Sequence, residues 1–121
     1  MADLLAISTG VIDGTTASDE VGPLNRINFQ LSEIGDGIAM VEAFSHCILF
    51  KTDDGLVAFD TSSVNGGERV VSAIRRWSKE RFNSLIYTHG HIDHVGGCGF
   101  FMEDAADNHH DEPNVIGHKN V

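Results

Sequence analysis

"LIYTHGHIDHVGG", residues 85–97, decides how this chain is interpreted, because it places three histidines and one aspartate within six positions. An apolar run precedes them and a glycine pair follows. His89 and His91 are two residues apart, and side chains at this spacing leave the same face of an extended chain. They can therefore approach one ion at about 2 Å from each ring nitrogen. Asp93 and His94 follow where the chain would turn into a helix, within reach of a second, neighbouring point.

The residue types in this segment favour a metal of the first transition row. Neutral imidazoles with one carboxylate suit Zn²⁺, whereas Ca²⁺ and Mg²⁺ prefer oxygen ligands. A helical zinc-protease site does not fit, because it needs two histidines four residues apart with a glutamate between them. Gly96 and Gly97 would let the backbone approach closely and bend without a Cβ clash. The alternative is a histidine-rich surface turn that binds metal adventitiously, but the preceding strand and the glycine pair favour a metal site.

The sequence before this segment predicts an antiparallel meander. Residues 26–35 alternate, with Ile27 and Phe29 on an apolar face and Gln30 and Ser32 on a polar one. Turns are expected at the glycines of "GDG" and "TDDG". The remaining strand candidates of the meander are residues 38–44, 46–51 and 56–60.

The hydrophobic period then changes to that of a helix. In residues 65–82, Val70, Ile74 and Trp77 recur at helical spacing, which predicts an amphipathic helix lying on a sheet with Trp77 in the core. Residues 84–88 read as a buried strand of a mixed or parallel sheet. A short helix and another core strand, residues 114–118, are expected to follow.

Length and composition restrict the function further. The 121 residues suffice for one small domain, here divided into an N-terminal arm or loop (1–25) and a domain portion (26–121). The net charge of −10 argues against a stable nucleic-acid partner, which needs Lys and Arg on phosphates. No apolar stretch reaches 18 residues, so no membrane partner is expected. The acidic N-terminus lacks a signal-peptide pattern, and two cysteines form no disulfide framework, so a cytoplasmic location is expected.

Two segments of the chain resemble a known family. "THGHIDHVGG" (88–97) resembles the His-x-His-x-Asp-His signature of the metallo-β-lactamase superfamily. "GLVAFDTS" (55–62) is similar to the strand and aspartate that precede that signature in the family. The helix between them and "NVIGHKNV" after them fall in the same order, so the resemblance covers residues 26–121. Within the superfamily, the chain looks most like the alkyl-sulfatase-like branch.

The resemblance implies a fold and a ligand set. The fold is α/β (α+β), half of an αββα sandwich with a mixed sheet and helices on one face. His89 and His91 would bind the first metal, and Asp93 and His94 the second. Asp60 would support the loop beneath the metals by hydrogen bonds. Family members take a third histidine, a bridging acid and a final histidine from later sequence, so the chain is expected to be the N-terminal part of a longer domain, apparently truncated.

Other side chains near the segment are possible ligands. His118 follows an apolar strand and is expected to support the site near its rim, although it could replace the missing third histidine. Cys98 lies four residues after His94 and is expected to pack beneath the loop, with soft ligation as the alternative. Residues 107–113, "DNHHDEP", are expected to form a solvated polar loop, with metal binding as the alternative.

The function expected is that of a metal-dependent hydrolase. A metal-activated water would attack an ester-type small molecule, namely a sulfate ester, a lactone or a thioester, and the cofactor would be one or two zinc ions or another first-row metal. Asp93 would both ligate the metal and orient the nucleophile. The alternative is a non-catalytic half-domain that holds metal without turnover or assembles with itself through an exposed sheet edge.

Overall fold

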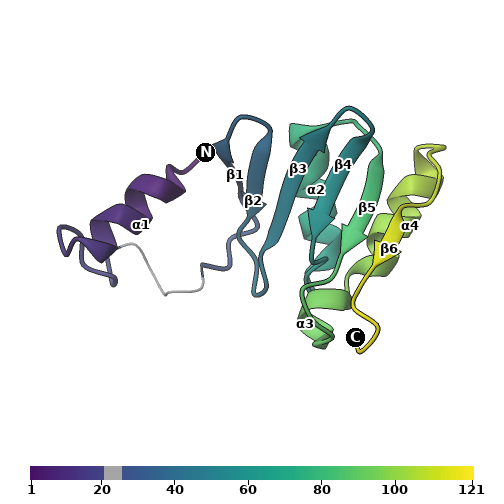
Figure 1. Ribbon diagram of the computed structural model, residues 1–121. Helices are drawn as coiled ribbons and strands as arrows, with labels where there is room; N and C mark the ends of the chain where they lie inside the picture. Colours follow the sequence, from purple (N-terminus) through teal and green to yellow (C-terminus); the bar gives the residue numbers. More distant parts are fainter. Residues whose placement is uncertain (21–25) are drawn as a thin grey trace.

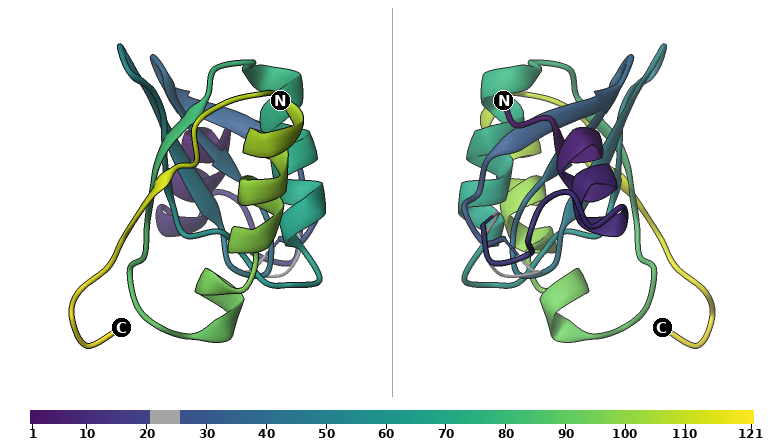
Figure 2. Two further views of the ribbon diagram at one scale, coloured as in Figure 1. Left: turned by 90° about the vertical axis from the view of Figure 1, so that its right-hand side faces the viewer. Right: turned by 90° about the vertical axis from the view of Figure 1, so that its left-hand side faces the viewer.

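The computed structural model describes residues 1–20 and 26–121. Within these residues, a mixed sheet runs in the order β1-β2-β3-β4-β5-β6, and helices α2 and α4 cover one of its faces (Figures 1 and 2). This arrangement confirms the predicted α/β (α+β) class with helices on one face of the sheet. The strands are β1 (Leu31–Gly35), β2 (Ile38–Val41), β3 (Cys47–Thr52), β4 (Gly55–Phe59), β5 (Phe82–Ile86) and β6 (Asn114–Ile116). The helices are α1 (Leu4–Ile12), α2 (Gly67–Trp77), α3 (Ile92–Val95) and α4 (Cys98–Asp107).

Strands β1 to β4 form the predicted antiparallel meander. Glycine occupies the turn positions with positive φ, Gly37 (69°) between β1 and β2 and Gly55 (115°) after β3. A Cβ on Gly55 would lie 2.5 Å from the carbonyl oxygen of Arg81, which accepts a hydrogen bond from Leu56 N–H at 2.7 Å. Gly55 therefore brings the β3–β4 hairpin against the start of β5, where the parallel pairing of β4 with β5 begins.

Helix α2 connects β4 to the parallel strand β5 and lies on the sheet with its apolar face. Val70 and Ile74 are fully buried, as the helical spacing predicted, while Trp77 packs against the core without complete burial. Phe82 of β5 meets Phe101 of α4 with ring centroids 4.7 Å apart. The core therefore fills the layer between the sheet and these two helices. No helix in the described residues is long and apolar enough to cross a membrane.

The first predicted strand starts at Leu31 rather than at residue 26, because a β-bulge interrupts it. The N–H of Phe29 donates to Glu42 O, and the N–H of Glu42 donates to Gln30 O, so two residues of one strand oppose one residue of the other. Phe29 has a φ of 55°, in the left-handed region. The bulge shifts the alternation of side chains, and Ser32, predicted on the polar face, is fully buried.

The N-terminal segment corrects the prediction of an arm or loop over residues 1–25. Helix α1 forms there and extends away from the β1 edge of the sheet, with its N-terminal end nearest β1 (Figure 1). Its start is capped by Asp3, whose Oδ1 accepts a hydrogen bond from Ala6 N–H at 2.9 Å. The prediction was wrong over this helix because it overlooked this N-cap aspartate before an apolar run. Residues 21–25 of the predicted arm lie outside the described residues.

Strand β6 is an exposed edge strand and not the core strand that the sequence predicted. Its residues Val115 and Ile116 are 47% and 48% exposed, because β6 pairs with β5 on one side only. The sheet face opposite the helices also carries apolar side chains, since residues alternate along each strand. The partly exposed members of this face in β3 and β4 are Ile48, Phe50, Val57 and Phe59.

Candidate metal centre

The histidine segment lies at the edge of the sheet where the parallel strands β4 and β5 both end. Phe59 and Ile86, the last residues of these strands, are paired, and Asp60 N–H donates to Ile86 O at 2.9 Å. The residues that follow the two strands therefore meet at one place, which is where open α/β sheets place their binding residues. The turn into a helix expected at Asp93 and His94 is helix α3.

Asp60 is a buried carboxylate that joins the two strand ends. Its Oδ1 accepts a hydrogen bond from Thr88 N–H at 2.8 Å, and its Oδ2 accepts one from Thr88 Oγ1–H at 2.7 Å. His94 Nδ1 lies 2.7 Å from the same Oδ2. Asp60 is only 5% exposed and has a φ of 61°, a backbone conformation that aspartate tolerates better than most residues. Asp60 therefore holds the loop beneath the histidines at two residues, Thr88 and His94.

These hydrogen bonds assign the ring nitrogens that carry a proton in two histidines. A carboxylate only accepts, so His94 Nδ1–H donates to Asp60 Oδ2. Thr88 Oγ1 gives its single proton to Asp60, so at 3.0 Å it can only accept from His89 Nδ1–H. When neutral, both imidazoles then keep the lone pair of Nε2 for another partner. One carboxylate thus sets the tautomer of His94 directly and that of His89 through Thr88.

The four side chains predicted as ligands gather in one cluster, defined as His89, His91, Asp93 and His94. The ring centroid of His89 lies 4.0 Å from that of His94 and 4.6 Å from that of His91. His94 Nε2 lies 3.4 Å from Asp93 Oδ2. The side chains of Asp93 and His94 are 28% and 22% exposed, so a solvent molecule or substrate can reach the cluster.

Ser45, in the loop between β2 and β3, reaches this cluster, a contact that the sequence did not predict. Its Oγ–H donates to Asp93 Oδ2 at 2.6 Å. This hydrogen bond is the main reason that the pKa of Asp93 lies below its ordinary value, and the neighbouring His94 and His91 act in the same direction. No local pattern in "EAFSHC" (42–47) indicates the contact, because it joins residues 48 positions apart.

The backbone beneath the cluster packs closely, and two glycines permit this. Thr61 donates its N–H and its Oγ1–H to the same carbonyl oxygen, that of His94, at 2.8 and 3.1 Å. A Cβ on Gly97 would overlap the carbonyl oxygen of Thr61, and a Cβ on Gly96 would lie 2.5 Å from Ile92 O. The close backbone approach predicted at this glycine pair is therefore confirmed. Thr61, like Thr88, was not identified from the sequence.

The cluster suits zinc by the chemistry of its donors. Imidazole nitrogens and a carboxylate are usual zinc ligands, and the Nδ1–H tautomers of His89 and His94 leave Nε2 available. In residues 1–20 and 26–121, however, no group of three or more histidine, cysteine, aspartate or glutamate side chains is arranged to hold a metal ion. The rings of His91 and His94 are tilted by 70° and 52° against that of His89. The cluster is thus a set of suitable donors, and not a closed ligand set.

His118 and Cys98, two of the other possible ligands, lie outside the cluster. His118 is exposed, and its Nδ1 accepts a hydrogen bond from Asn120 N–H at 3.2 Å. The C-terminal turn that contains it nevertheless borders the histidine segment, because Val121 packs close to Gly90. Cys98 is partly buried against the core, as predicted for a packing cysteine.

The family model described as the metallo-beta-lactamase superfamily matches residues 40–114, which is more than half of the chain. The matched range contains Ser45, Asp60 and all four members of the histidine cluster. No curated protein matches the chain by sequence.

Solved structures share the fold at low sequence identity. A metallo-beta-lactamase from Cronobacter sakazakii is 17% identical, with a TM-score of 0.56 over 61% of this chain and 28% of its own. A subclass B3 metallo-beta-lactamase of Bradyrhizobium japonicum is 23% identical, with a TM-score of 0.57 over 70% and 32%. The stereoselective inverting sec-alkylsulfatase Pisa1 from Pseudomonas sp. is 22% identical, with a TM-score of 0.56 over 73% and 14%. The chain therefore spans less than a third of the length of each of these proteins.

Proposed function

The chain belongs to the metallo-beta-lactamase superfamily, and we propose that it carries the metal-holding part of a hydrolase. The proposed ligands of one or two zinc ions, or of another first-row metal, are His89, His91, Asp93 and His94. The observation that supports this assignment is the Asp60 network, which holds Nδ1 of His89 and His94 and so leaves the Nε2 lone pairs as the ligating positions. A histidine whose Nδ1–H is held by a carboxylate or another acceptor is the usual form of a zinc ligand.

The residues of the chain would position the reacting groups. A bound zinc ion would supply Lewis acidity and a water that is nucleophilic near neutral pH. Asp60 holds His94 directly and His89 through Thr88. Ser45 holds one carboxylate oxygen of Asp93, Oδ2. With one oxygen held in this way, Asp93 is proposed both to ligate the metal and to orient the attacking water.

The proposed substrate is an ester-type small molecule: a sulfate ester, a lactone or a thioester. The match to Pisa1, described as a sec-alkylsulfatase, supports the sulfate ester among these. Function belongs to sites and not to folds, so a fold likeness can order these substrates but cannot select one. The proposed compartment is the cytoplasm, since Cys47 and Cys98 are free thiols in the structure.

Zinc retention tests the ligand assignment. The purified chain is loaded with ZnCl₂, dialysed, and analysed by inductively coupled plasma mass spectrometry; it should retain one or two zinc ions. His91→Asn should lose most of this zinc. His109→Asn serves as the matched control, because it removes an exposed histidine outside the cluster at a φ of 56° that asparagine tolerates. No retained zinc in the unsubstituted chain, or equal loss in both variants, would contradict the proposed centre.

A non-catalytic half-domain is the second candidate, and two observations favour it. The donors of the cluster are not arranged as a closed ligand set within the described residues. Apolar side chains are also exposed along β6, an unpaired edge through which a homo-oligomer could form. Turnover of a sulfate ester, lactone or thioester by the zinc-loaded chain distinguishes the two candidates. Zinc retention without turnover, together with dimers in light scattering, would favour the half-domain.

A further inference from the structure

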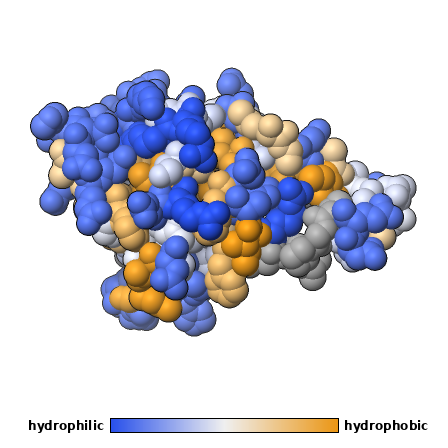
Figure 3. Space-filling model, turned by 180° about the vertical axis from the view of Figure 1, so that it is seen from behind, coloured by the Kyte–Doolittle hydropathy of each residue, from blue (hydrophilic) through white to orange (hydrophobic). Residues whose placement is uncertain are grey.

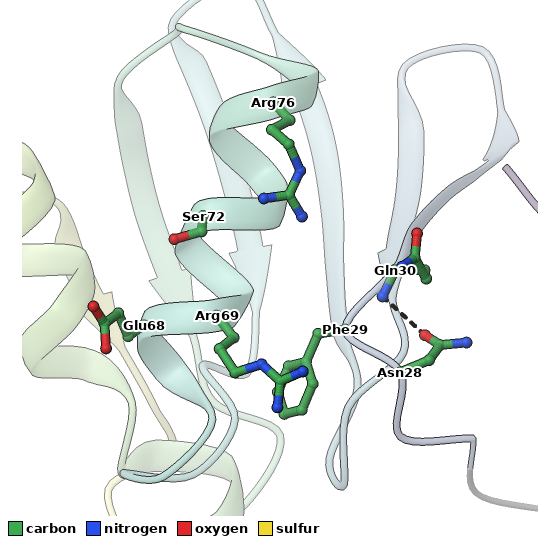
Figure 4. A pocket seen from close by; sticks show the side chains of 7 residues that line it. All are labelled: Asn28, Phe29, Gln30, Glu68, Arg69, Ser72 and Arg76. Atoms are coloured by element: carbon green, nitrogen blue, oxygen red, sulfur yellow. Dashed lines mark hydrogen bonds between the residues drawn. The ribbon is translucent and has the colours of Figure 1, made fainter.

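A groove on the helix side of the sheet has the composition of an anion site and shares no residue with the histidine cluster. It has a volume of about 390 Å³ and lies between α2 and the bulged segment before β1. One wall is formed by Arg69 and Arg76 of α2, and the other by Asn28, Phe29 and Gln30 (Figure 4). Strongly hydrophilic residues gather on this side of the molecule, with apolar residues between them (Figure 3).

The two arginines of the groove are not neutralised by acidic partners. Arg69 and Arg76 are seven residues apart, or about 10 Å along the helix axis. Neither forms an ion pair with any described residue, whereas Arg75 of the same helix pairs with Asp104 at 2.6 Å. In Figure 4, the Arg76 side chain runs along the helix toward the level of Ser72, above Arg69. The groove therefore presents two guanidinium groups to one space.

The carboxylates nearest the groove are occupied or point elsewhere. Glu42, behind the bulge, is buried and pairs with Arg26 at 2.8 Å, and it accepts a hydrogen bond from Asn28 Nδ2 at 3.2 Å. Glu68 contributes to the rim, but its carboxylate points to the other side of α2 (Figure 4). Two positive charges thus stand together in a chain whose net charge is −10.

A strained backbone holds the second wall in place. Phe29 adopts its φ of 55° at a bulge position that glycine usually occupies. Its ring lies 3.8 Å from the guanidinium carbon of Arg69 and closely against Gly66. The same bulge lets Asn28 Oδ1 accept from Gln30 N–H at 2.8 Å (Figure 4). Backbone strain of this kind persists where surrounding contacts enforce it, and it occurs frequently at binding sites.

We propose that this groove binds a small molecule with two oxyanion groups through Arg69 and Arg76. Guanidinium groups present a planar set of donors that matches the oxygens of phosphate and carboxylate. Two guanidinium groups that face one groove suit a ligand with two acidic groups, a diphosphate or a dicarboxylate, better than one with a single group. The side-chain amide of Gln30, which has no partner in the described ranges, offers a further donor from the opposite wall. The inference does not depend on the metal centre.

Calorimetric titration of the metal-free chain tests this proposal. The probes are pyrophosphate, succinate and inorganic phosphate at low ionic strength. Pyrophosphate or succinate should bind at least about tenfold more tightly than inorganic phosphate, because each of its two acidic groups can pair with one guanidinium. The tighter of the two identifies the class of acid. Added salt should weaken the binding, as expected for exposed charges.

Matched variants locate the binding. Arg69→Gln with Arg76→Gln should weaken the binding of the preferred probe by about tenfold or more. Lys79→Gln with Lys119→Gln removes the same charge at exposed positions outside the groove and should bind as the unsubstituted chain does. If circular dichroism shows that the double arginine variant does not fold, Arg76→Gln is used alone. This single variant should bind the preferred probe no more tightly than the unsubstituted chain binds inorganic phosphate. Equal losses in both double variants, or no advantage of a two-group anion, would overturn the proposal.

Discussion

Replacing Asp60 by asparagine tests whether one buried carboxylate controls two histidines of the candidate metal centre. The variant keeps the size of the side chain and a backbone φ of 61°, which asparagine also tolerates. The amide oxygen can still accept from Thr88 N–H, but the amide nitrogen now faces Thr88 Oγ1 and His94 Nδ1. Because an NH₂ group only donates, the His94 proton must move to Nε2. The Thr88 hydroxyl loses its carboxylate acceptor and can donate to His89 Nδ1 instead, which moves the second proton as well.

The magnitude follows from the two hydrogen bonds that change at Oδ2. A hydrogen bond to a charged group contributes about 1.5–3 kcal/mol, and a neutral replacement about 1 kcal/mol. The free energy of unfolding should therefore fall by about 1–4 kcal/mol, which corresponds to roughly 4–16 °C in Tm for a chain of this length. Zinc affinity should fall about 10- to 100-fold, the usual cost of losing the partner that orients a ligating histidine.

Long-range ¹H–¹⁵N NMR of the imidazole rings reports the tautomers, and zinc titration reports the affinity. Thr88→Val is the companion variant, since it removes the hydroxyl between Asp60 and His89 but leaves the Asp60–His94 contact in place. Only His89 should then lose its fixed Nδ1–H. The reasoning fails if both rings keep the proton on Nδ1 in Asp60→Asn and zinc binds with unchanged affinity.

Three further predictions concern the packing and the charges around the site. Gly97→Ala should lower the free energy of unfolding by about 3 kcal/mol or more, because the new Cβ meets a backbone carbonyl. Gly99→Ala is the control: its Cβ would enter open space in helix α4, so the Tm should not fall. Ser45→Ala should raise the Asp93 pKa toward its ordinary value in a carboxyl ¹³C titration. The ionised Asp93 carboxylate stabilises the folded chain above the ordinary aspartate pKa, and this stabilisation is lost as the pH falls through the lowered pKa of the folded state. The free energy of unfolding of Ser45→Ala should therefore depend less on pH in this acidic range. The Cys47 thiol, whose pKa is raised by complete burial, should react with iodoacetamide only after unfolding, and reaction in the native chain would contradict the assigned core.

Local patterns predicted much of this fold because the contacts behind them are local or periodic. The apolar runs of β2 to β4 and the helical spacing in α2 reflect burial in the core, so they can be read along the chain. The grouping of His89, His91 and His94 follows from their spacing at the end of a strand. The close approach at Gly96 and Gly97 follows from their lack of a side chain.

Other features depend on contacts between distant segments, for which a single sequence carries no pattern. The hydrogen bond from Ser45 to Asp93 exists only because the β2–β3 loop and helix α3 meet at one edge of the sheet. The bulge at Phe29 could not be predicted from the sequence either. Glycine usually occupies a bulge position with this left-handed backbone, and here the residue is aromatic. The alternating pattern around Phe29 therefore predicted a regular strand and placed Ser32 on the wrong face.

The strain beneath the histidine cluster bears on how the site is formed. Asp60 and Ser62 both have left-handed backbones, with φ of 61° and 62°, and such a conformation costs about 1–2 kcal/mol in most residues that carry a Cβ. It persists only where other contacts enforce it. Here Thr61, fully buried between them, donates twice to His94 O, and Gly97 N–H donates to Ser62 O at 3.0 Å. Because these contacts are made by atoms of the chain itself, the loop that aims His94 should fold without a metal ion. Metal binding would then need only side-chain rotations within a loop already in place.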